Sequence, residues 1–503
     1  MLWSWLLIIA ATGVWMAHWY RFPLFLDYYY HLHTARGFLR VGGVALHNFW
    51  DGAPAGYPHL YPPVIPLLLG CAVRCGVSPL AVMRWPTALM FPMLLVVLRW
   101  LSCRWYGPRT SWWMVVAALI PYTLFLQCAT APAAAASLLL LLLLYGAIER
   151  GRHVAAGCLF GAIWYTHPGM PWVALLSLLV AIVLWPERRA VVVRALVLGM
   201  VLATPWLMHL SHHLGAFTAI SIQENRFVEI YPVLYLLAAI GGWVGWCRGR
   251  DVRVLLALVI GCLPMLPVFR YRFFNGEGLL PVVLLAGYGL SWVHERLAVR
   301  PIPVRAKALA LAVAVAAWAC SPSMGVVQRP IAAAWGESTP WRLLTWMEQE
   351  PKGNDAGLYE GWMEDAADRV RRLTASDEII WCNYRFIATL LGSMADRAVS
   401  VGSLFYGSSR PQVGELMVSS SVFVWIKDPD PDMVATHRRV LERYSLELME
   451  ETDLAAFYRQ PGVTARMQPV SAVVPLGVAW ALLALLAGAG VWDYRRNDVK
   501  RSS

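Results

Sequence analysis

The segment Leu26-Asp27-Tyr28-Tyr29-Tyr30-His31-Leu32-His33 follows an apolar run over residues 2–19 and opens a polar stretch that ends at Tyr61-Pro62-Pro63. Asp27 therefore falls just past the end of a predicted membrane span. A carboxylate this close to a bilayer is costly unless it faces a protein cavity or a cation, which makes it a candidate functional residue. The alternative is structural, with the tyrosines at headgroup level and the aspartate as a helix cap.

The composition indicates a polytopic helical membrane protein. Of the 503 residues, 58% are hydrophobic and 15% are charged, and apolar runs long enough to cross a bilayer recur along the chain. The first run has no small-residue cleavage site after it and is therefore predicted to be a retained span. We expect about twelve spans, near residues 2–19, 86–103, 111–126, 132–148, 154–170, 171–185, 195–210, 231–247, 254–269, 279–293, 306–321 and 470–492.

The distribution of arginine predicts the orientation of these spans. The arginine-rich loops are 104–109, 149–153, 187–194, 248–253 and 294–307. Because basic loops stay on the cytoplasmic side, we expect all of them inside, with both chain termini. Residues 61–80 are apolar but carry Arg74 and several prolines, so we expect a helix on the outer membrane surface there. The short loops and the arginine bias favour a bacterial plasma membrane.

The segment 323–468 differs from the rest of the chain. It carries 20 acidic and 15 basic residues, a net charge of −5, whereas the remainder carries +16. Strand-length apolar patches at 378–382 and 421–426 lie between helical patterns, which predicts a small α/β domain on the extracytoplasmic side.

The chain thus divides into three parts. We expect a transmembrane domain over 1–322 with a first external loop at 20–85, the α/β domain over 323–468, and a last span with a basic cytoplasmic tail over 469–503. Nucleic-acid binding is excluded, because the basic residues are scattered among apolar runs and form no stripe.

Acidic residues are scarce in the membrane part. Only nine occur through residue 322, and the predicted topology places four of them inside. An outward-facing general base or metal site must therefore come from histidine or from the other five acids. These are Asp27, Asp51, Glu224, Glu229 and Glu277.

Three motifs, in order along residues 1–300, resemble those of GT-C glycosyltransferases. Asp27-Tyr28-Tyr29-Tyr30-His31-Leu32, followed by Tyr61-Pro62-Pro63, resembles their first external loop, which carries the catalytic aspartate. Ser221-Ile222-Gln223-Glu224 resembles a motif of the catalytic subunit of oligosaccharyltransferase, and Tyr271-Arg272-Phe273 resembles its Arg-Phe segment. The resemblance implies that the arginine meets the phosphate of a lipid-linked donor.

Two other motifs of that subunit have no counterpart here. Its second acidic pair would fall at Gln127-Cys128-Ala129-Thr130-Ala131-Pro132, which contains no acid. Its WWDYG signature, which holds the acceptor sequon, is missing as well. The nearest string is Gly361-Trp362-Met363-Glu364-Asp365, which is not a match.

Glycosyl transfer from a lipid phosphate needs a carboxylate to orient or activate the acceptor and cations to take the charge of the leaving phosphate. We assign the first role to Asp27 and the second to Arg272, with Arg270, because a guanidinium matches phosphate geometry. Asp27 and Glu224 are expected to bind Mg²⁺ or Mn²⁺, ions that favour oxygen ligands. The alternatives are an interfacial anchor for Arg272 and a solvated loop residue for Glu224.

Three further residues belong to the candidate site. His31 follows Asp27 by one helical turn and is expected to hold its orientation, unless it serves only in interfacial packing. Tyr30 stands beside it. His167, in Thr166-His167-Pro168, is either a site residue or a turn residue.

The sequence predicts a membrane glycosyltransferase that uses a polyprenyl-linked sugar donor at the outer face and a protein, lipid or polysaccharide acceptor. The nearest relatives are expected among oligosaccharyltransferases. A polyprenyl-phosphate-monosaccharide transferase, a transporter or flippase of such lipids, and an assembly scaffold remain alternatives. A transporter should carry repeated halves, and no repeat is visible. For a scaffold, Asp27 would be dispensable.

Overall fold

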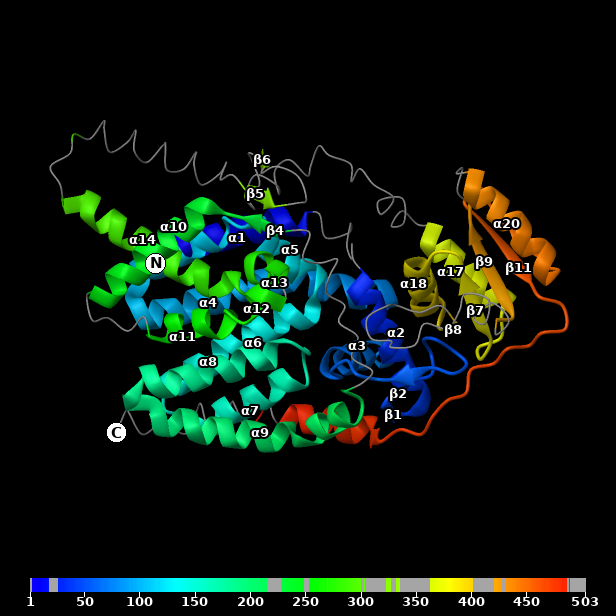
Figure 1. Ribbon diagram of the computed structural model, residues 1–503, viewed down its shortest axis with the longest axis horizontal. Coiled ribbons are helices and arrows are strands. Elements are labelled where there is room, and N and C mark those ends of the chain that lie inside the picture. The colour runs from blue at the N-terminus through cyan, green and yellow to red at the C-terminus, as the bar shows by residue number, and fades with distance from the viewer. Residues whose placement is uncertain are drawn as a thin grey trace.

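The computed structural model (Figure 1) consists of a helical bundle, a set of short helices at one end of it, and a sheet-containing unit beyond them. The residues that it describes are 2–17, 26–214, 228–247, 253–268, 270–299, 303, 323–326, 332–334, 362–400, 420–427, 431–485 and 488.

The bundle contains most of the described helices. They are α1 (Leu2–Met16), α4 (Pro79–Ala118), α5 (Tyr122–Thr130), α6 (Pro132–Glu149), α7 (His153–Trp164), α8 (Met170–Leu184), α9 (Arg189–His212), α10 (Pro232–Cys247), α11 (Arg253–Cys262), α12 (Met265–Val268), α13 (Arg270–Asn275) and α14 (Leu279–Val299). In the described part of the chain, four helical stretches are long and apolar enough to cross a membrane: 79–118, 132–149, 186–212 and 270–298. The total of about twelve spans stays a prediction.

The long helix α4 is two segments that turn back on each other at Gly107. That glycine has φ 85°, a left-handed conformation that glycine adopts without strain. On either side of it, Ser102 donates to Ser111 (2.9 Å) and Ser111 donates to the backbone oxygen of Arg99 (2.8 Å). Residues 99 and 111 would lie about 18 Å apart on one straight helix, so the chain must reverse here.

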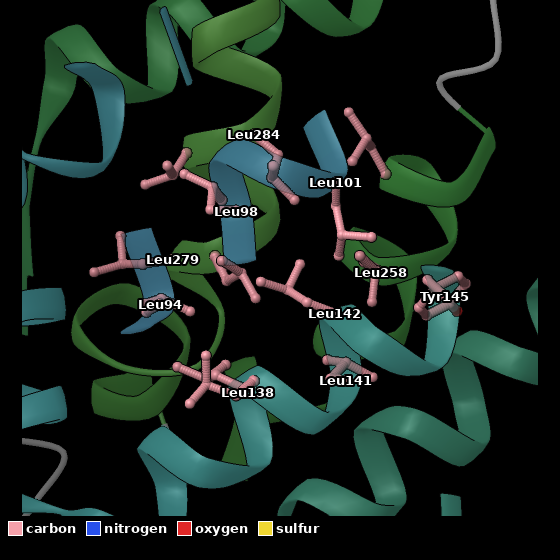
Figure 2. Close-up of a cluster of buried hydrophobic side chains, with 14 of the residues drawn as sticks. Leu94, Leu98, Leu101, Leu138, Leu141, Leu142, Tyr145, Leu258, Leu279 and Leu284 are labelled. Atoms are coloured by element: carbon pink, nitrogen blue, oxygen red, sulfur yellow. The ribbon is translucent and has the colours of Figure 1, made fainter. Parts of the chain in front are cut away.

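Leucines from four helices fill the centre of the bundle (Figure 2). They come from α4 (Leu94, Leu98, Leu101), α6 (Leu138, Leu141, Leu142), α11 (Leu258) and α14 (Leu279, Leu284), and all are buried. Lipid tails are as apolar as leucine, so close packing has to hold such a bundle together. A Cβ at Gly241 of α10 would lie 2.0 Å from the backbone oxygen of Leu285, which shows how closely α10 and α14 approach.

The outer surface of the bundle is apolar. On α9, Val193, Val197 and Val201 are exposed and follow one another at four-residue spacing, so they form one outward row. Trp243 and Trp246 of α10 are exposed as well. This surface suits a lipid environment.

The segment that the sequence assigns to the first external loop folds into α2 (Leu26–Val41), α3 (Val64–Arg74) and short strands between them. The strands are β1 (Gly43–Val44), β2 (His47–Asn48) and β3 (Tyr57–Pro58). Figure 1 shows α2 and α3 between the bundle and the sheet. β1 pairs with β12 (Val474–Pro475), and the indole of Trp480 donates to the backbone oxygen of Leu67 (3.2 Å). The loop is therefore fixed by segments far along the chain.

The larger sheet has five strands in the order β10-β11-β9-β7-β8. They are β7 (Ile379–Cys382), β8 (Ala398–Val399), β9 (Val422–Ile426), β10 (Glu447–Glu451) and β11 (Ala455–Arg459), accompanied by α17 (Trp362–Leu373), α18 (Arg385–Ala395) and α20 (Pro431–Tyr444). β7 and β9 lie in the two segments for which the sequence predicts strands. The sheet is mixed, because β7 pairs in parallel with β8 and β9 while β11 pairs antiparallel with β9 and β10.

The sheet unit is docked on α2 of the first external loop. Arg40 forms an ion pair with Asp396 (3.1 Å), and the ring of His33 hydrogen-bonds the backbone oxygen of Arg397 (3.0 Å). The edge strand β8 continues into the loop, because Ala53 donates to Val399 and Val399 donates to Trp50 through backbone groups. The sheet and the first external loop therefore lie on the same side of the bundle.

Three segments differ from expectation. The span expected at 111–126 is interrupted, because α4 ends at Ala118 and α5 begins only after Pro121, which has no N–H to continue a helix. The last described helix begins at Leu476, after β12, and not near residue 470. β5 (Ser323–Val326) pairs with β4 (Val228–Ile230) and with β6 (Ala332–Ala334), so the start of segment 323–468 lies with the membrane part.

Candidate active site

The first part of the candidate site is one face of α2. Asp27 is in its first turn and is half-buried, whereas Tyr30 and His31 are buried. The ring of Tyr61 packs edge-on against both, with centroid distances of 5.6 Å to Tyr30 and 4.9 Å to His31. The polar stretch between Asp27 and Tyr61 thus folds back on itself and fixes the helix that carries the aspartate.

The second part is the turn between α13 and α14. Arg272 donates through Nη1 to Oε1 of Glu277 at 2.8 Å. The turn is tight, because the N–H groups of Gly276 and Gly278 both donate to the backbone oxygen of Arg272. A Cβ at Gly278 would lie 2.4 Å from the backbone oxygen of Phe273, so the sequence Asn-Gly-Glu-Gly lets Glu277 return to Arg272.

His167 joins this pair from the turn between α7 and α8. Its Nε2 lies 3.2 Å from Nη1 of Arg272 and 3.8 Å from Oε1 of Glu277. Its other ring nitrogen, Nδ1, accepts hydrogen bonds from the N–H groups of Gly169 and Met170, both at 3.0 Å. His167 and Glu277 are buried, while the Arg272 side chain is 32% exposed.

Two connections hold these parts next to each other. The N–H of Val64, at the start of α3, donates to the backbone oxygen of Tyr165 (3.0 Å), two residues before His167. Helix α5 contacts both α2 and α13. Its Gln127 lies beside Gly276, since a Cβ there would approach the Gln127 amide nitrogen to 3.2 Å.

The electrostatics of the site agree with this proximity. Burial, with a smaller contribution from His167, lowers the pKa of His31 to about 3. The pKa of His167 lies well below its usual range, first because of burial and then because of the Arg272 guanidinium. Both histidines are therefore neutral at pH 7, and Arg272 provides the positive charge of the cluster.

The site residues predicted from the sequence fall into three groups: those in contact within the site, one that is exposed, and one outside the described residues. In the first group, Tyr30 contacts His31, and His167 contacts Arg272. Arg270, the first residue of α13, is exposed. Glu224 lies outside the described residues, so its approach to Asp27 stays a prediction.

Glu277 is the residue that the sequence did not single out. It was one of five acids left on the predicted outer side, and it lies in a glycine-flanked turn five residues after Arg272. That glycine-flanked turn was the available signal.

The predicted metal site is not assembled by the described residues alone. Among them, no group of three or more His, Cys, Asp or Glu side chains is close enough to hold an ion. Asp27 offers one carboxylate. The metal site shared by Asp27 and Glu224 therefore stays a prediction.

The arginine-rich loops meet elsewhere in the bundle. Arg104 pairs with Glu149 (3.1 Å), and Arg253 pairs with Glu187 (3.0 Å). Each pair links two of the loops that the sequence predicts to lie on the inner side, and both pairs are partly exposed.

Comparison with known proteins gives a fold-level match. Neither a protein-family model nor a curated protein sequence matches the chain. Among solved structures, ArnT from Cupriavidus metallidurans, bound to undecaprenyl phosphate, has a TM-score of 0.51 at 15% identity over 93% of this chain and 99% of its own. The archaeal oligosaccharyltransferase AglB from Archaeoglobus fulgidus, in complex with an inhibitory peptide and a dolichol-phosphate, has a TM-score of 0.53 at 10% identity. That match covers 84% of this chain and 69% of AglB.

Both structures are GT-C glycosyltransferases of the membrane, and both cover most of the chain. At 10% and 15% identity the likeness concerns the fold and carries no residue roles. The chain therefore has the GT-C fold, as its three motifs predicted.

Proposed function

We propose that the protein is an integral membrane glycosyltransferase that moves a sugar from a polyprenyl-phosphate-linked donor to an acceptor on the extracytoplasmic side. One observation carries this proposal: the helix with Asp27 stands beside a buried cluster in which Arg272 supplies a guanidinium. A GT-C fold alone would not specify the chemistry.

The reaction follows from the groups present. A hydroxyl or amide of the acceptor attacks the anomeric carbon of the sugar, and Asp27 orients it and accepts its proton. The bond between the anomeric carbon and the phosphate oxygen breaks, which leaves negative charge on the lipid phosphate. Arg272 stabilises this charge with a planar pair of N–H donors.

The two structural matches support a lipid-monophosphate donor. ArnT, described with undecaprenyl phosphate, aligns over 99% of its length, and AglB, described with a dolichol-phosphate, aligns over 69%. The sequence also lacks the WWDYG signature and the second acidic pair of oligosaccharyltransferases. We therefore favour a sugar linked to a polyprenyl monophosphate, with transfer of an oligosaccharide as the second candidate.

We further propose that Asp27 and Glu224 share a Mg²⁺ or Mn²⁺ ion. Such an ion would offset charge on the donor phosphate, and two carboxylates are hard oxygen ligands of the kind it prefers. Exhaustive treatment with EDTA should then abolish transfer, and added Mn²⁺ or Mg²⁺ should restore it. Full activity after EDTA would remove the metal from the proposal and leave Asp27 as a general base.

The function is tested by transfer of labelled sugar in proteoliposomes that contain one donor at a time. The two donors are a sugar on undecaprenyl monophosphate and an oligosaccharide on undecaprenyl diphosphate. We expect transfer with the first, and a loss of at least about 100-fold in Asp27→Asn, because an essential general base contributes 10²–10⁴-fold. Glu187→Gln makes the same chemical change in an exposed pair and should keep wild-type activity. Activity of Asp27→Asn above about a tenth of wild type would contradict the assigned role.

A further inference from the structure

The two ring nitrogens of His167 have different tasks, and the hydrogen bonds determine which one carries the proton. Nδ1 accepts from two backbone N–H groups, those of Gly169 and Met170. Backbone N–H groups cannot reverse their polarity, so Nδ1 must be unprotonated. Because the ring is neutral, its single proton sits on Nε2.

This tautomer determines what kind of contact His167 makes with Arg272. Nε2–H and the Nη1–H groups are both donors, so the 3.2 Å separation between them is not a hydrogen bond from one to the other. Both nitrogens instead lie near one acceptor, because Oε1 of Glu277 is 2.8 Å from Nη1 and 3.8 Å from Nε2. An oxygen slightly closer to His167 would meet both donors at hydrogen-bonding distance.

We propose that the Nε2–H of His167 is a second donor to the phosphate of the lipid-linked sugar, held in this tautomer by the first turn of α8. The inference rests on the proposed function and assigns a further residue to its phosphate site. The phosphate oxygen takes the position between Nη1 of Arg272 and Nε2 of His167, which Glu277 marks in the structure. The partly exposed Arg272 gives access to it.

A neutral N–H donor next to a guanidinium has a clear advantage here. It adds a hydrogen bond that grows stronger as negative charge develops on the phosphate, and it needs no rearrangement at that moment. A second cation at the same place would be repelled by Arg272. A serine could rotate its hydroxyl away, whereas the α8 N–H groups fix the imidazole.

Two substitutions test the roles of the two ring nitrogens of His167 separately. His167→Asn keeps an oxygen near Nδ1 for the N–H groups of Gly169 and Met170, and asparagine is a good cap, but it removes the Nε2 donor. His167→Gln places an amide N–H near Nε2 and weakens the cap. His153→Asn and His153→Gln, at the start of α7 in an arginine-rich loop, are the matched controls.

The measurement is binding of undecaprenyl phosphate to the full-length protein in nanodiscs, with undecaprenol, which has no phosphate, as the reference lipid. We expect wild type to prefer undecaprenyl phosphate and His167→Asn to bind it about 10- to 100-fold more weakly, the value of a hydrogen bond to a charged group. His167→Gln should stay within about threefold of wild type although it unfolds at a lower temperature. Both lipids should bind to the His153 variants as they bind to wild type.

A purely structural role as a cap predicts the reverse order. His167→Asn would then bind like wild type and His167→Gln would be impaired, and either result would overturn the inference. If His167→Gln does not fold, the comparison of His167→Asn with His153→Asn decides alone. Equal binding of undecaprenol and undecaprenyl phosphate by wild type would also refute the phosphate site. The expected binding pattern without any sugar transfer would instead leave this inference standing and contradict the proposed function.

Discussion

Two arginine–glutamate pairs of nearly equal length lie in different surroundings in this molecule. Arg272 and Glu277 are 2.8 Å apart, and Arg253 and Glu187 are 3.0 Å apart. The side chain of Glu187 is 64% exposed, whereas that of Glu277 is fully enclosed. The first pair lies beside α5, which also contacts the helix that carries Asp27, and the second joins two arginine-rich loops.

The difference shows that distance alone does not identify a functional pair. An exposed pair gains little, because water solvates both partners equally well when they separate. An enclosed carboxylate has no such alternative and keeps its partner until another anion replaces it, so in the free protein it holds the guanidinium in one place. Arg272 is therefore positioned before any ligand arrives, and Arg253 is not.

The largest expected effect separates the two arginines by activity. Arg272→Ala should lower the catalytic efficiency of sugar transfer by about 10²–10³-fold, the usual loss when one preorganised donor to a developing anion is removed. Arg272→Lys should lose about tenfold, because lysine keeps the charge without the planar fork. Initial rates with a defined undecaprenyl-phosphate-linked sugar provide the measurement.

Arg253→Ala and Arg253→Lys are the controls for these variants and should be silent. A mere membrane anchor needs only positive charge, so equal rates for wild-type Arg272, lysine and alanine would remove Arg272 from the reaction.

The next effect is the acid sensitivity of the stability of the region around α2. Burial lowers the pKa of His31 and His59 to about 3 and that of His33 to about 4. These groups are neutral in the folded protein but take up protons in the unfolded chain below about pH 6.5, so the free energy of unfolding should fall as the pH drops from 6.5 toward 4. Each group costs about 1.4 kcal/mol per pH unit in that window.

Thermal unfolding in detergent between pH 8 and pH 4 measures this effect. His59→Asn should flatten the dependence, because asparagine does not titrate. His47→Asn is the control in the same loop, since the ring of His47 is half-exposed and bonds only the loop backbone at Ala55 among its described contacts. An unchanged slope in His59→Asn would show that other groups cause the acid sensitivity.

A smaller effect concerns the two glutamates. Glu277→Gln should reduce the free energy of unfolding by about 1–2 kcal/mol. The amide oxygen of glutamine is a weaker acceptor for the Arg272 guanidinium than a carboxylate, but the partly exposed Arg272 can still be solvated by water. Glu187→Gln should change it by less than about 0.5 kcal/mol. Denaturation midpoints of both variants in the same detergent test the prediction. Equal midpoints would mean that enclosure does not distinguish the pairs.

The sequence predicted local features of the fold well. The helices α3, α6, α14 and α20 and the strands β7 and β9 follow from apolar periodicity and turn residues. The reversal at Gly107 was implied by two expected spans separated by arginines. Pro121 nevertheless divided one expected span, because the apolar run continues through the break.

The contacts that build the site could not be predicted, because they join distant parts of the chain. The docking of α2 on α18 depends on Arg40 meeting Asp396, a pairing that no local pattern reveals. Glu277 is different, because it lies only five residues after Arg272 in a glycine-flanked turn. Its enclosure and its approach to His167 required the fold. His167 carried a readable signal, since it lies two residues before the N-terminal cap of α8, but its contact with Arg272 required the fold.

The most direct test of the account is a cryo-electron microscopy map of the protein in nanodiscs with undecaprenyl phosphate. The account predicts the phosphate against Nη1 of Arg272, beside Nε2 of His167, with Asp27 facing the same space. A phosphate bound at the arginine-rich loops near Arg253 and Glu187, with the Arg272–Glu277 pair unchanged and out of contact with the lipid, would contradict it.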